Sequence, residues 1–277
     1  MTGRRRLEDV SHFFLDGGGS IPAEPITRLP IRTRPRLLQV VSASSRVVGA
    51  MVVAGMAAAL ARGGKRVLVG EGPPTAFGAA FGLGLVLPGD RSAQPILETP
   101  AGVWVSTVDL GRPISCLDPQ IRRAVEERVA ESDVVFIHFG LSDLESVQPN
   151  VASPDELIFI VDEPTADGLL EVYRAIKGVV AGNEAVSVRL IVHGNPSSSG
   201  VSWARLVEGV ERFLHRDCTI LGTLREESRL ATTFLSGAFF DEGWDEIVRV
   251  LAPLASRWSR PVTETERRNP VLRLPGR

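Results

Sequence analysis

Residues 42–50 occupy the position of a phosphate-binding loop but lack the side chains that would hold a phosphate. The segment reads SASSRVVGA and follows an apolar run at residues 37–41. A working GxxxxGK[ST] loop needs glycines, so that backbone N–H groups can converge on the phosphates, a lysine for the β- and γ-oxygens, and a hydroxyl for Mg²⁺. The polar side chains left here for an unconventional phosphate contact are those of Ser44, Ser45 and Arg46.

The segments around this loop predict a strand–loop–helix–strand unit. We expect a strand at residues 37–41, a helix at about 49–62 that a Gly-Gly pair ends, and a second strand at 66–69. Residues 70–104 are rich in Gly and Pro and predict a short helix and loop. We further expect helices at 118–131, 165–177, 203–214, 226–236 and 244–258, of which 203–214 and 244–258 have apolar positions at helical spacing. Further strands are expected at 132–141, 156–162, 188–193 and 219–224.

The stretches beside the loop resemble the MinD/ParA group of deviant P-loop ATPases, and most closely the FlhG proteins, the MinD-like regulators of flagellar number. The similar stretches are AAALA at residues 57–61 and GKRVL at 64–68. Aligned on these, the family's signature lysine falls on Ser44, its phosphate-gripping lysine on Gly49 and its Mg²⁺-binding threonine on Ala50. The resemblance therefore implies a nucleotide loop that has lost its diagnostic residues.

Two further segments resemble motifs of the same family. Residues 132–141, SDVVFIHFGL, are similar to a strand that ends in an Mg²⁺-orienting aspartate, and His138 stands at that position. Glu71 stands near the acidic residue that ends the family's second strand, and residues 156–178 are similar to a strand–loop–helix with the tripeptide Glu163-Pro164-Thr165. A neutral imidazole does not replace a carboxylate around Mg²⁺. We therefore expect His138 to be a partly buried hydrogen-bonding residue, with no metal bound.

The similar segments cover about residues 37–255 and imply a doubly wound α/β fold of the MinD/ParA type. Such a fold has a mainly parallel sheet with helices on both faces, and its ligands bind at the carboxyl ends of the strands. We expect three parts: a flexible N-terminal extension at 1–36, the α/β domain at 37–258 and a polar basic tail at 259–277.

Charge is divided unevenly along the chain, whose formal net charge is −2. Residues 1–36 hold seven Arg and four acidic residues (+3), and 257–277 hold six Arg and two acidic residues (+4), which leaves −9 on residues 37–256. An acidic domain argues against broad binding to nucleic acid, which needs basic surface to displace counterions. The basic ends are either solvated or touch anionic lipid or an acidic partner, so a peripheral membrane contact is compatible with them but not required.

Length and composition predict a chain that buries a sizeable core, because 44% of its 277 residues are hydrophobic. Cys116 and Cys218 lie far apart without CxxC spacing, which predicts two reduced, buried thiols. Apolar runs of membrane-spanning length are missing from the sequence. The closing helix at 244–258 corresponds in position to a membrane-targeting helix of the similar family, but it contains Pro253, and we expect it to pack on the sheet.

A short apolar patch at residues 7–15 should not stay free in water. Its apolar side chains are those of Leu7, Val10, Phe13, Phe14 and Leu15. A Gly-rich linker at residues 16–20 follows, so the patch can dock either on its own domain or on another protein as a helix-in-groove peptide. We take it as a candidate partner-binding segment.

Together these features predict a MinD/FlhG-like pseudo-ATPase that is not an enzyme and needs no cofactor. It would be an adaptor or regulator of a bacterial envelope-associated machine, namely a flagellum, a pilus or a polysaccharide or cellulose secretion complex. We expect it in the cytoplasm, held at the inner face of the membrane through a protein partner, and we expect any homodimer to be independent of nucleotide. Two alternatives stay open: an active ATPase with an unconventional loop, and a degenerate relative of the bacterial tyrosine kinases, weakened by Tyr173 being the only tyrosine.

Overall fold

The structure is a computed structural model, and its description is limited to part of the chain. The described residues are 34–43, 45–72, 78–85, 94–111, 114–144, 154–162, 165–182, 186–194, 203–224, 234 and 242–259. Several predicted features lie outside them: the peptide at 7–15, Ser44, Glu163 with Pro164, the tail from residue 260, and all of the helix at 226–236 except Phe234.

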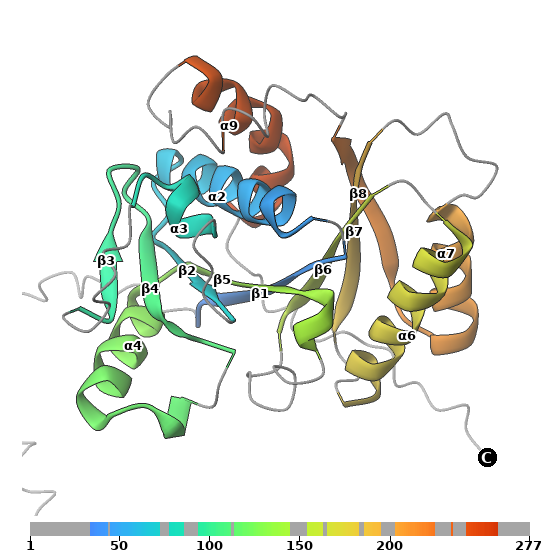
Figure 1. Cartoon of the computed structure of the whole chain (residues 1–277), viewed down its shortest axis with the longest axis horizontal. Helices are drawn as coiled ribbons and strands as arrows, with labels where there is room; N and C mark the ends of the chain where they lie inside the picture. The colour runs from blue at the N-terminus through green and yellow to red at the C-terminus, as the bar shows by residue number, and fades with distance from the viewer. Residues whose placement is uncertain are drawn as a thin grey trace, which may run out of the picture. The chain divides into compact units, whose positions relative to one another are not determined.

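An eight-stranded sheet forms the centre of the described structure (Figure 1). Its strands lie in the order β3-β4-β2-β5-β1-β6-β7-β8, and all neighbours are parallel except β3 and β4. The bounds are β1 Arg36–Ser42, β2 Val67–Glu71, β3 Ile96–Glu98, β4 Trp104–Asp109, β5 Val134–Gly140, β6 Glu156–Val161, β7 Ser187–His193 and β8 Cys218–Leu224. The predicted α/β class with a mainly parallel sheet is confirmed.

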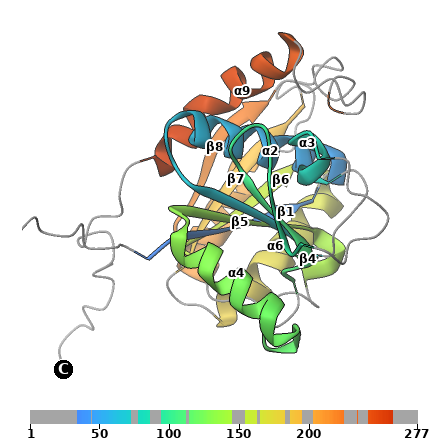
Figure 2. The ribbon, with the colours of Figure 1, turned by 90° about the vertical axis from the view of Figure 1, so that its left-hand side faces the viewer.

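Helices cover both faces of this sheet, as the side view in Figure 2 shows. One face carries α2 Arg46–Arg62, α3 Ala79–Gly82 and α9 Glu242–Ala255, and the other carries α4 Pro119–Glu131, α6 Ala166–Gly182 and α7 Trp203–Gly209. The described residues also contain short helical turns: η2 Ile114–Cys116, η3 Leu141–Asp143, the π-helical turn η5 Val210–Leu214, and η6 Ser256–Trp258. Two apolar cores result, one on each face of the sheet, which is why the inner strands are continuous apolar runs.

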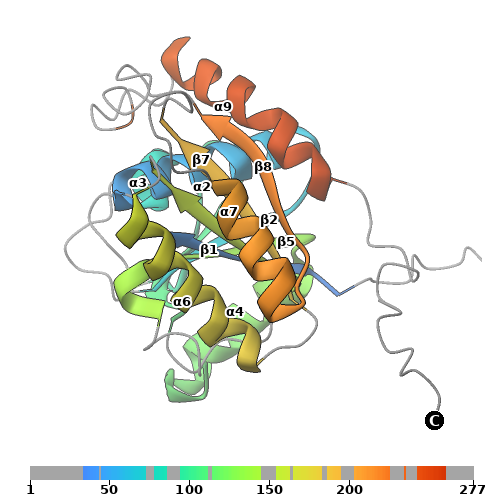
Figure 3. The same cartoon turned by 90° about the vertical axis from the view of Figure 1, so that its right-hand side faces the viewer.

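Helix α2 is buried along most of its length because it lies between the sheet and α9. Figure 3 shows α9 lying across that side of the molecule. At Gly55 a Cβ atom would stand 2.4 Å from Leu251 and 2.9 Å from Ile247, so the absence of a side chain lets the two helices approach closely. The closing helix was expected to pack on the sheet, but it packs mainly on α2, and its contact with the sheet is that of Leu254 with Gly222 of β8. Among the described residues, none of the helices is both long and apolar enough to span a bilayer.

One predicted helix boundary is wrong, and one stretch predicted as helix and loop contains a strand. Helix α2 begins at Arg46 and not at Gly49, because the hydroxyl of Ser45 accepts from the N–H of Val47 and caps an extra turn. The Gly- and Pro-rich stretch at 70–104 also contains strand β3, which the sequence pattern did not indicate. A strand of three residues has no period of its own and is stabilised by its antiparallel pairing with β4.

Candidate functional site

Three polar side chains meet beneath the start of α2, at the carboxyl ends of β1, β5 and β2. The Oγ atom of Ser42 and Nε2 of His138 are hydrogen bonded at 2.8 Å, and Nδ1 of His138 lies 3.6 Å from Oε1 of Glu71. Parallel register explains the meeting, because Glu71 is the Cα partner of His138 across β2 and β5. All three residues are buried, with exposed fractions of 2 to 5%.

Glu71 also ties the end of β2 to the start of α3. Its Oε1 accepts from the backbone N–H of Ala79 at 2.6 Å. The Cα of Gly78 packs on the same carboxylate, since a Cβ atom there would lie 2.0 Å from an oxygen of Glu71. The carboxylate that ends this strand is therefore engaged by the protein itself.

Gly49 closes this cluster from above. A Cβ atom built on Gly49 would lie 1.6 Å from Oγ of Ser42 and 2.7 Å from Nε2 of His138. Both distances are far shorter than real Cβ contacts, so any side chain at position 49 would have to displace the Ser42–His138 pair. The position that the resemblance assigns to a phosphate-gripping lysine is thus one where the surrounding atoms leave room for glycine alone.

Three backbone donors at the junction of β1 and α2 are used within the protein. The N–H of Ala43 donates to the carbonyl of Ile160 at 2.9 Å. The N–H of Val47 donates to the hydroxyl of Ser45 at 3.2 Å. The N–H of Gly49 donates to the backbone carbonyl of Ser45 at 3.1 Å. A phosphate-binding loop needs such groups to converge on the ligand. Here these three amides bond within the helix or to the neighbouring strand β6 instead.

An internal ion pair lies beside the first turn of α2. The guanidinium of Arg46 is paired with the carboxylate of Asp143, which also accepts from the N–H of Gly140 at 3.1 Å. A helix N-terminus favours a negative charge nearby because its free N–H groups carry positive partial charge. Asp143 supplies that charge from within the chain and neutralises Arg46 at the same time.

The order Ser42, His138, Glu71 is also that of the hydrogen-bonded chain in serine hydrolases, in which an acid orients a histidine that activates a hydroxyl. Such chemistry needs a nucleophile that a substrate can reach. Ser42 is 2% exposed and is covered by Gly49. The arrangement is therefore a buried structural contact and not an accessible nucleophile.

The structure brings together most of the residues singled out from the sequence, which are Ser45, Arg46, Gly49, Glu71 and His138. Ala50 belongs instead to the apolar core on that face, at 1% exposure. His138 is hydrogen bonded as predicted, but it is fully rather than partly buried. Groups of three or more His, Cys, Asp or Glu with metal-binding geometry do not occur among the described residues.

Sequence reasoning missed two members of this cluster, Ser42 and Asp143. Ser42 carried one usable signal, since it is a polar residue directly after the predicted strand at 37–41, at the strand end where such a fold binds its ligands. Asp143 follows that second strand by three residues, in a stretch without a distinctive pattern. A second polar pair was also missed, at the ends of β6 and β7, where Nδ1 of His193 lies 3.0 Å from the carboxylate of Asp162.

The two cysteines differ, and the expectation of two buried thiols is wrong for one of them. Cys116 is exposed, whereas Cys218 is 1% exposed, and both are free. Burial raises the pKa of the Cys218 thiol to about 12, so it stays protonated near neutral pH.

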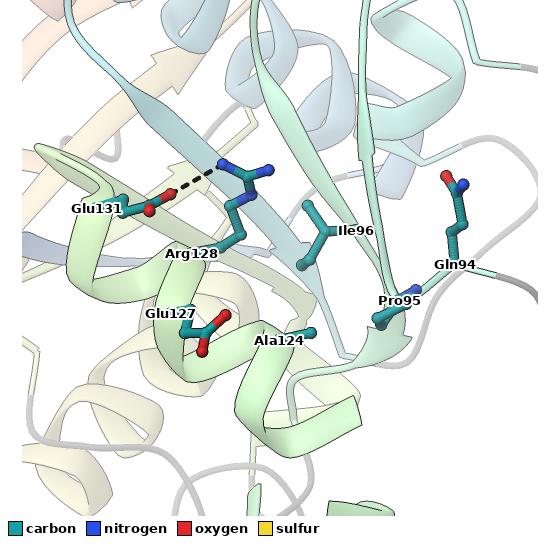
Figure 4. Close-up of a pocket in the computed structure, with 7 residues that line it drawn as sticks. All are labelled: Gln94, Pro95, Ile96, Ala124, Glu127, Arg128 and Glu131. Atoms are coloured by element: carbon teal, nitrogen blue, oxygen red, sulfur yellow. Dashed lines mark hydrogen bonds and ion pairs between the residues drawn. The ribbon is translucent and has the colours of Figure 1, made fainter. Parts of the chain in front are cut away.

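A cavity of about 270 Å³ lies between β3 and α4, on the other face of the sheet from the Ser42 cluster (Figure 4). Its lining residues are Gln94, Pro95, Ile96, Ala124, Glu127, Arg128 and Glu131. The guanidinium of Arg128 is paired with Glu131 at 2.8 Å and stacks on Trp104 at 4.3 Å. Glu127 is paired with Arg123, so the charged side chains of the cavity already have ion-pair partners in the protein. The cavity is separate from the predicted site.

Comparison with known proteins places the fold. No family model matches the chain, and no curated protein matches it. A chain of the MinC:MinD cell division protein complex from Aquifex aeolicus matches with 18% identity and a TM-score of 0.55, over 82% of this chain and 98% of that chain. MinD from Aquifex aeolicus matches at 17% identity and a TM-score of 0.54 (80% and 95% covered). A ParA family ATPase from Chlorobium tepidum TLS matches at 15% identity and a TM-score of 0.51 (80% and 98% covered). This chain therefore has the fold of the MinD and ParA ATPases.

Proposed function

We propose that this chain is a catalytically inactive, MinD/FlhG-like pseudo-ATPase that serves as an adaptor or regulator of a bacterial envelope-associated machine. The observation that carries the inactive part of the proposal is the contact between Gly49 and Ser42. In the resembled ATPases the aligned position holds the lysine that grips the phosphates. In this chain the same place is filled by the Ser42–His138 pair.

The energetic argument rests on lost contacts. Gly49, Ala50 and Ser44 stand where the resembled family has a lysine, a threonine and a second lysine. Hydrogen bonds to charged groups contribute about 1.5–3 kcal/mol each. Losing three would move an ATP dissociation constant of micromolar order beyond millimolar. Arg46, the cation of the loop segment, is in addition already paired with Asp143.

The adaptor part of the proposal follows from the fold and the resemblance. One of the similar solved structures is a complex of MinD with MinC, so a chain of this fold can take a protein partner. The machine we have in mind is a flagellum, a pilus or a polysaccharide or cellulose secretion complex. We place the protein in the cytoplasm, at the inner face of the membrane through that partner, with residues 7–15 as the docking segment.

Calorimetric titration of the full-length protein with ATP and ADP, in the presence of Mg²⁺, tests the inactive part. We expect no binding heat at micromolar nucleotide and no phosphate release. An active MinD-type ATPase serves as the positive control. Micromolar binding would overturn the proposal in favour of the active alternative, in which Ser44, Ser45 and Arg46 hold the phosphates. Loss of that binding in Arg46→Ala would then establish the unconventional loop.

A further inference from the structure

A buried carboxylate lies among three guanidinium groups at the amino ends of the strands, which is the end of the sheet opposite to the Ser42 cluster. The carboxylate belongs to Glu156 at the start of β6, and the guanidiniums to Arg36 of β1, Arg189 of β7 and Arg257 of η6. Figures 2 and 3 show the start of β1 and the end of α9 at the same end of the sheet. Strand alternation turns the three strand side chains toward the face that α2 and α9 cover.

Two of the neighbours satisfy Glu156. Its Oε1 accepts from Nε1 of Trp258 at 3.2 Å, and its Oε2 accepts from Nε of Arg189 at 3.3 Å. Arg189 is itself engaged elsewhere, since its Nη1 donates to Asp217 at 2.7 Å and to Thr219 at 2.5 Å. Glu156 and Arg189 in this inner part of the cluster are therefore held by direct hydrogen bonds.

Arg36 and Arg257 are held much more loosely. Nη2 of Arg36 lies 3.8 Å from Oε1 of Glu156, and Nε of Arg257 lies 4.0 Å from Oε2, distances that allow attraction between charges but not a hydrogen bond. The Arg36 side chain is 14% exposed, and its Nε is a buried donor without an acceptor among the described residues. Buried donors of this kind call for a partner, such as an ion or water.

The local charge points to the sign of that partner. Three guanidiniums face two carboxylates, those of Glu156 and Asp217, which leaves one positive charge in excess. Arg257 is 47% exposed and so opens the cluster to solvent. A planar guanidinium matches carboxylate and phosphate oxygens through parallel N–H donors.

We propose that Arg36 and Arg257 form a binding site for an oxyanion at the amino ends of the strands. The oxyanion is a carboxylate or a phosphate group. This site is independent of the proposed pseudo-ATPase function. The oxyanion comes either from free phosphate or from the acidic side chains of a bound polypeptide. Because the Glu156 cluster lies at the other end of the strands, a ligand here leaves the Ser42 cluster untouched.

Calorimetry on the full chain tests the site with two probes, inorganic phosphate and a hexaglutamate peptide, at constant ionic strength in chloride. We expect saturable binding of at least one probe to the wild type. Arg257→Gln should weaken it about tenfold or more, because a charge-assisted contact is lost. Arg62→Gln is the matched control, since Arg62 forms an exposed ion pair with Asp245 and should change the affinity less than about twofold.

Both sources of the oxyanion support the site and are told apart by affinity. Tighter binding of hexaglutamate identifies polypeptide carboxylates as the ligand, and tighter binding of phosphate identifies a free or bound phosphate group. Arg36→Gln should also abolish binding, provided that circular dichroism shows that this variant is folded. If Arg36→Gln does not fold, the result for Arg257→Gln alone decides the test. Failure of both probes to saturate, or equal affinity of wild type and Arg257→Gln, overturns the proposal.

Discussion

Gly49 in α2 lies so close to Ser42 at the end of β1 that a Cβ atom on the glycine would stand 1.6 Å from the serine Oγ. Gly49 is an ordinary helical residue outside the positive-φ region, so backbone freedom is not what the position needs. What it needs is the missing side chain, because the hydrogen bond between Ser42 and His138 fills the space beneath.

Gly49→Ala should therefore destabilise the protein. An alanine normally improves a helix interior by about 0.5–1 kcal/mol relative to glycine. Overpacking a filled site costs about 1–3 kcal/mol, and at 1.6 Å the clash should prevail. Urea denaturation should show a lower midpoint with an unchanged slope.

Two further variants separate the clash from other effects of Gly49→Ala. Gly178→Ala lies in α6, where an added Cβ has no atom within 4 Å, and it should leave stability unchanged or raise it. Ser42→Gly removes the clashing serine atoms and leaves Nε2 of His138, at 2.7 Å, so adding Gly49→Ala to that background should cost less than in the wild type. Equal costs in both backgrounds would show that Ser42 is not the obstacle.

The thiols should react in two distinct phases. Cys116 is exposed and should react with a disulfide reagent at once, whereas Cys218 should react only after unfolding. The pKa of Cys218 is raised to about 12 by burial, from about 8.5 for a free thiol. Its contribution to stability is thus fully present below about pH 8.5 and is lost as the pH rises toward the folded-state pKa.

Thiol counting at pH 8, with and without denaturant, checks this. The Cys116→Ser variant should lose the rapid phase and keep the denaturant-dependent one. A rapid phase that survives in Cys116→Ser would mean that Cys218 is accessible in the native state.

Any dimer of this chain should be insensitive to nucleotide. In the resembled ATPases a signature lysine reaches the phosphates of the other subunit, and the aligned residue here is Ser44. Light scattering should give the same mass with and without millimolar Mg·ATP. A shift from monomer to dimer on addition of ATP would contradict both this expectation and the proposed inactivity.

Phe13 and Phe14 should be needed for the partner and not for the fold. Each phenylalanine that a partner buries contributes roughly 1.5–3 kcal/mol. Replacing both with alanine should abolish capture of the native partner while the melting temperature stays nearly constant. The matched variant Ser11→Ala with His12→Ala changes polar residues of the same segment and should retain capture.

The opposite result for the Phe13 and Phe14 variant is equally clear. A melting temperature that falls by several degrees would mean that residues 7–15 pack on their own domain, which is the other docking mode expected for an apolar patch of this kind.

Much of the fold was predictable because parallel strands buried on both faces are apolar runs of recognisable length. Strands β1 and β7 lie within one residue of their predicted bounds for this reason. The short edge strand β3 was not predictable, because its conformation depends on pairing with β4 and not on its own three residues. The start of α2 was misplaced because a single cap, Ser45, moves a helix end by a full turn.

The sequence by itself determined which side chains are missing from the phosphate loop, since Gly49 and Ala50 cannot supply an ammonium or a hydroxyl at any geometry. Only the tertiary structure decided what replaces them. Ser42 and His138 are 96 residues apart and meet because β1 and β5 are neighbours in one register. Contacts of this kind depend on strand order and on the alternation of side chains across a sheet, and no local pattern in the chain encodes either.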